Sequence, residues 1–227
     1  MHPRFIAAGH LWDMKRILVA GVTGLVGAEV LRVALKSPEI KGVSAVTRRR
    51  MGIRHPRLIE WLSTGGDLLS GLRQEPVDAV ICCLGTTIRA VGGDKAKFIH
   101  VDKDLVVGLA RWAKKHGVRC FAVVSAVGAD ATSRVFYNKV KGEMEQELKT
   151  IGLPELHIFH PSILTGPRQE KRAGERIGIA VMSMIAPLLP AKYKPMPHDV
   201  LAKALLKCIG TPGGTHSYLE IVRLAKT

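Results

Sequence analysis

The segment 16-RILVAGVTGLVG-27 decides the fold, because apolar residues run directly into three glycines at the spacing G-x-x-G-x-x-G. A strand, such a turn and then a helix make up the phosphate-binding start of a dinucleotide-binding fold. Gly21 and Gly24 would let the main chain approach a pyrophosphate at the positive end of the helix, and Gly27 would let the helix pack on the strand. A tight turn without a ligand needs glycines too, so the prediction rests on the position of the turn between strand and helix.

Strands and helices alternate along the rest of the chain. Near-continuous apolar runs such as VDAVICCLG at 77–85 are typical of parallel strands that are covered on both faces. Between them, apolar residues recur at helical spacing, as in the amphipathic segment 94–115. We predict strands at 16–20, 42–50, 57–62, 77–85, 118–126 and 156–162, and helices at 28–37, 94–115 and 134–150. This order predicts an α/β fold with a doubly wound parallel sheet, the Rossmann fold.

The length and composition fit one packed domain. With 227 residues, 47% of them hydrophobic and 23% charged, the chain can bury a large core. We assign residues 15–227 to one nucleotide-binding domain, in which 162–215 form a small C-terminal appendage on the substrate side. Residues 1–14 have no signal-peptide pattern and are predicted to be a disordered extension.

The net charge of +15, from 34 Lys and Arg against 19 Asp and Glu, favours anionic partners. The basic residues are scattered with few aromatic residues among them, so we expect no nucleic-acid partner. The longest uncharged stretch, 177–191, contains Pro187 and Pro190 and is too short to span a bilayer. We expect no membrane-surface contact either, and keep it as the lesser alternative because Lys192 and Lys194 flank this stretch.

Cysteine and histidine are placed without a metal-binding pattern. The chain has nine histidines without an H-E-x-x-H arrangement, and its cysteines form no C-x-x-C pair. We therefore expect no metal site. The apolar neighbours of the cysteines predict buried, reduced thiols and a cytoplasmic setting. The cysteines are Cys82, Cys83, Cys120 and Cys208.

The end of the second predicted strand indicates which cofactor the fold binds. A carboxylate at this place would hydrogen-bond the adenosine 2′-hydroxyl of NAD, and the chain has none there. Thr47 is followed instead by Arg48, Arg49 and Arg50, which suit the additional phosphate of NADP by charge and by fork geometry. A solvated basic turn is the alternative. The pattern favours NADP(H) as cofactor.

A serine, a tyrosine and a lysine follow the central strand. Ser125 ends that strand, and Tyr137 and Lys141 form a Y-x-x-x-K pair in the next helix. This spacing places the phenol and the ammonium group on one helix face, where the lysine could lower the phenol pKa from about 10. Tyr137 could then act as an acid or a base near neutral pH. Spacing alone favours a surface pair, but the preceding nucleotide turn and strand-end serine favour a reductase site.

The chain resembles the short-chain dehydrogenase/reductase superfamily. It is most similar to the atypical single-domain branch that contains the Tat-interacting-protein oxidoreductases and their bacterial relatives, and the resemblance extends from Lys15 to about Leu206. The segments that carry it are GVTGLVG at 21–27, TRR at 47–49, CLGTT at 83–87, SAVGAD at 125–130, YNKVKGEME at 137–145 and HPSILTGPRQEKRAGE at 160–175. CLGTT stands where better-known members have Asn-Ala-Gly, which alters the electrostatics expected of the site.

The resemblance implies a role for each matching residue. The pyrophosphate would be lined by Gly21, Thr23, Gly24, Leu25, Val26 and Gly27. The 2′-phosphate would be held by Arg48 and Arg49, the adenine by Asp67 and Leu68, and the nicotinamide ribose by Leu84, Gly85, Thr86 and Lys141. Ser125 would bind the substrate carbonyl oxygen, Tyr137 beside the nicotinamide would donate its proton, and Lys141 would lower the pKa of Tyr137. Arg168 would lie at the mouth of the cofactor or substrate site, or be a solvated loop charge.

These residues predict an NADP(H)-dependent oxidoreductase that transfers a hydride between the nicotinamide and a carbonyl or alcohol substrate. Substrate specificity would come from 162–197, and we expect a monomer or a homodimer. His198 and Asp199 are expected to be a structural helix start. The alternative function is an NADPH-binding regulator that acts through a protein partner with little or no turnover. The intact Ser125, Tyr137 and Lys141 favour the enzyme.

Overall fold

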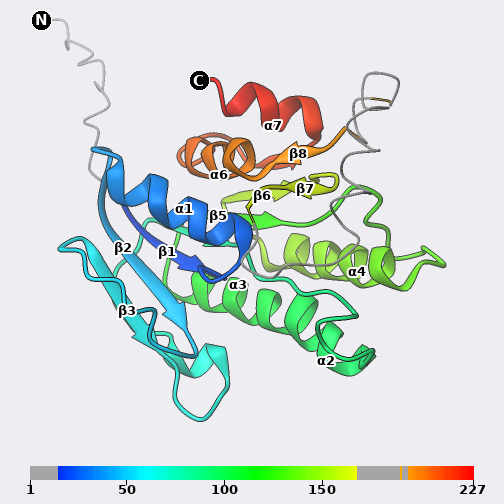
Figure 1. Cartoon of the computed structure of the whole chain (residues 1–227), viewed down its shortest axis with the longest axis horizontal. Helices are drawn as coiled ribbons and strands as arrows, with labels where there is room; N and C mark the ends of the chain where they lie inside the picture. The colour runs from blue at the N-terminus through cyan, green and yellow to red at the C-terminus, as the bar shows by residue number, and fades with distance from the viewer. Residues whose placement is uncertain (1–14, 168–189, 191–193) are drawn as a thin grey trace, which may run out of the picture.

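The computed structural model describes residues 15–167, 190 and 194–227. Its centre is a sheet of seven parallel strands in the order β3-β2-β1-β4-β5-β6-β9 (Figure 1). The strands are β1 (Lys15–Ala20), β2 (Ile40–Thr47), β3 (Leu58–Leu62), β4 (Ala79–Cys82), β5 (Cys120–Val124), β6 (Glu155–Phe159) and β9 (Gly214–His216). The predicted doubly wound Rossmann fold is confirmed.

The strand order reverses at β1. The chain builds β2 and β3 on one side of β1 and all later strands of the sheet on the other side. In open parallel sheets, ligands bind outside the carboxyl ends of the strands at this switch point. The topology therefore points to the crevice between the loops after β1 and β4.

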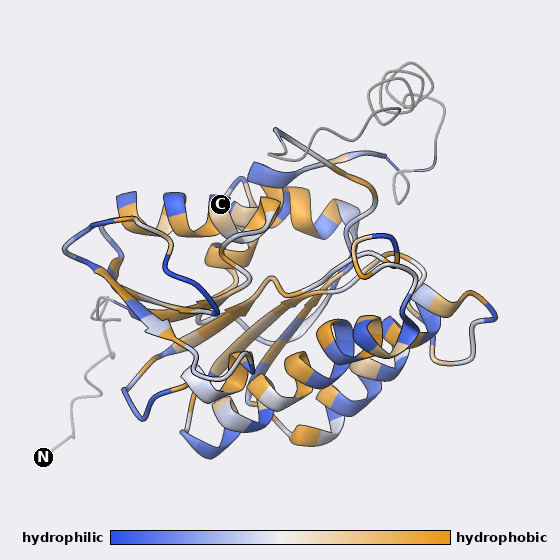
Figure 2. Cartoon of the chain, turned by 60° about the horizontal axis from the view of Figure 1, so that its bottom comes forward, coloured by the Kyte–Doolittle hydropathy of each residue, from blue (hydrophilic) through white to orange (hydrophobic). Residues whose placement is uncertain are grey.

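Two layers of helices cover the sheet. One face carries α1, α6 and α7, and the opposite face carries α2, α3 and α4 (Figure 1). Their bounds are α1 (Leu25–Lys36), α2 (Lys95–Ile99), α3 (Leu105–Lys115), α4 (Phe136–Ile151), α6 (His198–Lys207) and α7 (Tyr218–Leu224). Apolar residues gather on the strands and on the helix faces turned toward them, and polar residues lie outside (Figure 2). Ile17 and Val19 of β1 pack under one layer and Leu18 under the other, which explains the continuous apolar run of this strand.

Several boundaries differ from the predicted ones. The predicted helix 94–115 is three consecutive pieces, α2, a π-helical turn at His100–Asp104 and α3. The short strand β9 and the helix α7 were not predicted, because Gly214, Thr215 and His216 lack the apolar alternation of a strand. A 3₁₀ turn lies at Leu68–Gly71, and β7 (Leu164–Thr165) pairs with β8 (Met196–Pro197) in a small second sheet.

Some predictions fall outside the described residues. These are Arg168, the family-like segment 168–175, the extension 1–14 and nearly all of the apolar stretch 177–191. Among the helices that the structure does describe, none is both long enough and apolar enough to cross a membrane. The described parts of the substrate-side region 162–215 are β7, β8, α6 and the start of β9. Its assignment to substrate binding stays a prediction.

Candidate active site

The glycine turn between β1 and α1 is shaped by close backbone contacts. Gly21 has φ +84°, and a Cβ there would lie 2.4 Å from the carbonyl oxygen of Cys83. A Cβ on Gly27 would lie 2.2 Å from the carbonyl oxygen of Gly21. The amide of Gly24 closes the turn by donating to that same oxygen at 3.0 Å. Since no side chain caps α1, the start of this helix is available to an anion.

Replacing Gly21 by alanine is expected to lower the free energy of unfolding by about 2–4 kcal/mol. Positive φ costs an L-residue roughly 1–2 kcal/mol, and the collision with the backbone of Cys83 adds a similar amount. Chemical denaturation would measure the loss. The matched control is Gly52→Ala, because Gly52 has φ +72° with nothing within 4 Å of a Cβ, so it reports the φ cost alone. Equal losses at both positions would contradict a steric role for Gly21.

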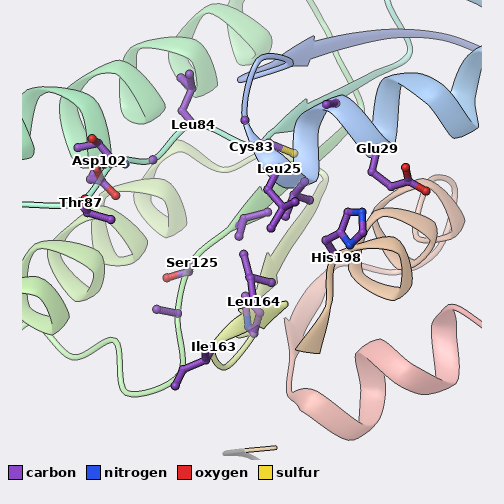
Figure 3. A pocket seen from close by; sticks show the side chains of 18 of the residues that line it. Leu25, Glu29, Cys83, Leu84, Thr87, Asp102, Ser125, Ile163, Leu164 and His198 are labelled. Carbon is purple, nitrogen blue, oxygen red and sulfur yellow. Dashed lines mark hydrogen bonds between the residues drawn. The ribbon is translucent and has the colours of Figure 1, made fainter. Parts of the chain in front are cut away.

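A cavity of 940 Å³ runs from the glycine turn to α4 (Figure 3). Its volume lies within the roughly 300–1,000 Å³ common for small-molecule sites. It opens at the carboxyl ends of β1, β4 and β5, where the topology predicts a ligand site. The predicted site residues that line it are Thr23, Gly24, Leu25, Val26, Leu84, Gly85, Thr86, Ser125, Tyr137 and Lys141.

The other predicted site residues lie apart from this lining. Gly21 and Gly27 form the turn beneath it. Arg48 and Arg49 are exposed beyond the end of β2, and neither is ion-paired within the described part of the chain. The Asp67 carboxylate accepts from the amide of Leu69 at 3.1 Å and caps the 3₁₀ turn. Leu68 beside it is buried in the core.

Tyr137 and Lys141 lie on one face of α4, and a buried aspartate completes the group. The Lys141 Nζ is 2.8 Å from Oδ1 of Asp102, and both side chains are almost fully buried. The other oxygen of Asp102 accepts from the amide of Thr86 at 2.8 Å. This aspartate therefore ties the loop after β4 to Lys141. Tyr137 stays 39% exposed, and its ring packs against Phe98 of α2.

The electrostatics correct one expectation. Although part of Tyr137 is exposed, the protein atoms around its phenol desolvate it and raise its pKa. The charge of Lys141 lowers the pKa by less and Asp102 raises it again, so the pKa lies above its ordinary value. Burial lowers the pKa of Lys141, but Asp102 and Tyr137 together outweigh this and leave that pKa raised. Lys141 therefore stays charged and does not bring the pKa of Tyr137 down to neutrality. Tyr137 stays a protonated phenol at neutral pH.

Ser125 is hydrogen-bonded to Glu145, which in turn contacts His160. Its hydroxyl donates to Oε1 of Glu145, and Nε2 of His160 lies 2.8 Å from the same oxygen. Ser125 and Glu145 are both buried, so this carboxylate serves only these polar neighbours among the described residues. The proton of Ser125 consequently points away from the cavity. Its oxygen is left to accept a hydrogen bond there, whereas the resemblance predicts donation to a carbonyl.

The sequence prediction missed four groups of this site: Asp102, Glu145, His160 and His198. Glu145 could have been found, because it follows Tyr137 and Lys141 at a further helical turn on the same face. His160 directly follows β6, at the carboxyl edge where ligands bind. Asp102 carries no such signal. His198 starts α6 as expected, but it also lines the cavity, and its Nδ1 lies 3.1 Å from the carbonyl oxygen of Thr165 (Figure 3).

Two known proteins share sequence similarity with most of this chain. Protein FMP52, mitochondrial, of Eremothecium gossypii is 33% identical over 164 residues, which cover 72% of this chain and 73% of that protein. Protein HTATIP2 of Rattus norvegicus is 28% identical over 214 residues, covering 88% and 83%. This similarity confirms the predicted resemblance to the Tat-interacting-protein branch.

Solved structures share the fold at low sequence identity. The reductase-containing di-domain of an archaeal non-ribosomal peptide synthetase superposes with a TM-score of 0.68 at 14% identity, covering 93% of this chain and 74% of that one. The Bordetella bronchiseptica enzyme WbmH, solved in complex with NAD+, has a TM-score of 0.63 at 17% identity, covering 89% and 74%.

The prediction of a cytoplasmic setting is contradicted by the relatives. The fungal FMP52 proteins are named mitochondrial. Unpaired cysteines argue only against an oxidising environment, so they could not distinguish one reducing compartment from another. The model of the NAD dependent epimerase/dehydratase family matches residues 17–148, a span that holds the glycine turn as well as Tyr137 and Lys141. The chain therefore belongs to the NAD dependent epimerase/dehydratase family.

Proposed function

We propose that this protein is an NADP(H)-dependent oxidoreductase that acts on a carbonyl or alcohol substrate. The observation that carries the proposal is the meeting of two groups in one cavity. The glycine turn lies at one end, and Tyr137 with the buried Lys141–Asp102 pair lies at the other. The cavity thereby combines a site for a dinucleotide with a proton donor for the substrate. Family membership supports a nicotinamide cofactor.

The residues present fit such a cofactor. The pyrophosphate would rest on the turn, because any side chain larger than hydrogen at Gly21 or Gly24 would crowd the backbone there. The adenosine 2′-phosphate would be held by Arg48 and Arg49, which are exposed after a strand that ends in Thr47 and not in a carboxylate. When bound, the nicotinamide supplies or accepts the hydride.

The side chains around Tyr137 suit the reduction of a carbonyl. Tyr137 is a protonated phenol, so it can donate its proton to the oxygen that becomes the alcohol. Lys141, fixed by Asp102, places a permanent positive charge beside the phenolate that this transfer leaves. Ser125 offers an oxygen that accepts from the alcohol formed, because its own proton is donated in a hydrogen bond to Glu145. We therefore infer that the site rests near neutral pH in the protonation state that carbonyl reduction requires.

Calorimetric titration with NADPH and NADH tests the cofactor. We expect NADPH to bind more tightly, and the Arg48→Ala, Arg49→Ala double variant to lose about 100- to 300-fold in NADPH affinity. Hydrogen bonds between charged groups contribute about 1.5–3 kcal/mol each, and exposure brings the two contacts toward the lower end. The affinity for NADH should not change, because NADH lacks the 2′-phosphate.

The control for this titration is Arg54→Ala, which removes another exposed arginine of the same loop. It should leave the NADPH affinity within about twofold, since general electrostatic attraction is weak and screened. Equal binding of the two nucleotides by the unmodified protein would overturn the NADP(H) assignment. Failure to bind either nucleotide would overturn the proposed function altogether.

A further inference from the structure

We propose that Cys120, His157 and Cys208 form a binding site for a thiophilic d10 metal ion, Zn²⁺ or Cu⁺. The two sulfur atoms and one imidazole nitrogen lie within 4.8 Å of one another. None of the three residues lines the 940 Å³ cavity, so this site is separate from the candidate active site. The proposal is independent of the proposed function.

Three different elements bring these side chains together. Cys120 is the first residue of β5, His157 lies in the middle of β6, and Cys208 is the C-cap of α6. Cys120 pairs with Glu155 across the parallel strands, so His157, two residues further along β6, presents its side chain on the same face as Cys120. Helix α6 covers that face and delivers Cys208. All three residues are buried, at 1%, 0% and 0% exposure.

Among the described residues, one imidazole nitrogen of His157 has no hydrogen-bond partner. Its Nδ1 lies 2.9 Å from Nε2 of His216, which leaves Nε2 for the side of the cysteines. Within the described residues, this buried Nε2 has no hydrogen-bond partner. A buried polar atom without a partner is rare enough to require an explanation. A metal ion bound by the lone pair of Nε2 would satisfy it.

The donor set has the chemistry of a soft-metal site. Thiolate and imidazole are the ligands preferred by Zn²⁺ and Cu⁺, whereas Mg²⁺ and Ca²⁺ require oxygen. Two thiolates cancel the charge of Zn²⁺, which suits a fully buried position in an apolar layer. In a tetrahedral Zn²⁺ site with Zn–S bonds of ~2.3 Å the ligand atoms lie about 3.7 Å apart, so atoms that lie within 4.8 Å of one another would approach by up to about 1 Å when the ion binds. His216 would hold the tautomer of His157, as groups behind metal-ligating histidines do.

This proposal departs from the prediction that the chain has no metal site. That prediction relied on short motifs, and the three ligands are far apart in the sequence, on elements that only the sheet and α6 bring together. The site would connect β5, β6 and the end of α6. We therefore expect the metal to stabilise the fold and to have no part in hydride transfer.

The test is titration of the full chain, reduced and stripped by a chelator, with Zn²⁺ and separately with Cu⁺ under anaerobic conditions. We expect one ion per chain and a rise in Tm of about 5–10 °C at a hundredfold excess over Kd. Co²⁺ in place of Zn²⁺ should give the near-ultraviolet charge-transfer bands of thiolate ligation. Of Zn²⁺ and Cu⁺, the ion that the protein holds more tightly against a competing chelator is the metal of this site.

The variants separate this site from other thiols. Cys120→Ser and Cys208→Ser should each remove at least half of the charge-transfer intensity and together abolish it, and His216→Gln should weaken binding about 10- to 100-fold. Cys83→Ser is the control, because Cys83 lies outside the cluster. If a cluster variant does not fold, alkylation of the unmodified chain in partially unfolding urea decides the question. Both thiols are buried in the folded chain, and bound metal should then slow their reaction relative to that of Cys83. No binding, bands that survive both cysteine changes, or absence of protection would overturn the proposal.

Discussion

Replacing Tyr137 by phenylalanine is expected to lower kcat for carbonyl reduction by about 100- to 10,000-fold. A positioned general acid contributes a factor of this size, and the cavity offers no other protonated phenol within the described residues. Phenylalanine keeps the ring, so its packing against Phe98 should persist. The measurement is NADPH consumption with a panel of aldehydes and ketones, alongside the Kd for NADPH, which should change little.

The matched control is Tyr218→Phe, which removes a phenol hydroxyl from α7, outside the cavity. It should retain full activity. The pH dependence gives a second check. Because burial raises the pKa of Tyr137, the phenol stays protonated through neutral pH, and kcat/KM for reduction should fall only above about pH 10. A fall in kcat/KM near pH 7, or an active Tyr137→Phe variant, would remove Tyr137 from the role of proton donor.

Replacing Asp102 by asparagine is expected to lower the free energy of unfolding by about 3–5 kcal/mol. The change leaves the ammonium group of Lys141 buried without an opposite charge, which costs more than the pair itself contributes. For a chain of this size the Tm should fall by about 6–20 °C. Thermal and urea denaturation would both measure the loss. The Asp102→Asn, Lys141→Met double variant should recover part of it, because no unpaired charge then remains.

An exposed pair provides the control for this prediction. Lys203 and Asp199 of α6 lie 3.5 Å apart with 49% and 41% of their side chains exposed. Asp199→Asn should cost no more than about 1 kcal/mol, since water screens such pairs. A comparable cost at Asp102 and at Asp199 would mean that the Lys141–Asp102 pair is hydrated in solution. If the double variant recovers no stability, the stability lost in Asp102→Asn comes from the hydrogen bond that the Thr86 amide donates to Asp102 and not from the unpaired charge of Lys141.

Much of the fold could be predicted because the signals are local. The apolar run into Gly21, Gly24 and Gly27 predicts strand, turn and helix in direct succession, and the structure has all three. Strands covered on both faces are recognisable by composition. The edge strand β9 was missed because it is three residues long and joins the sheet by backbone pairing with β6, which leaves no mark on composition.

The candidate site was less predictable because its charges are completed by distant residues. Lys141 was identified by its spacing from Tyr137, but the spacing does not reveal that Asp102 would pair with it. That pairing, with the burial of the phenol, decides the protonation of Tyr137. Likewise, the direction in which Ser125 donates its hydrogen bond depends on Glu145 of α4. The Glu145 carboxylate is contacted in turn by His160, which follows β6.

By itself the sequence determined the order of the main strands and helices before β9, the glycine turn that admits a phosphate and the helical face that carries Tyr137 and Lys141. Each of these follows from backbone geometry or side-chain periodicity over a few neighbouring residues. Only the tertiary structure decided which of these groups share a cavity, which way their protons point and which distant cysteines meet His157. Protonation and hydrogen bonding depend on burial and on opposite charges within a few ångströms, and folding alone brings such neighbours together.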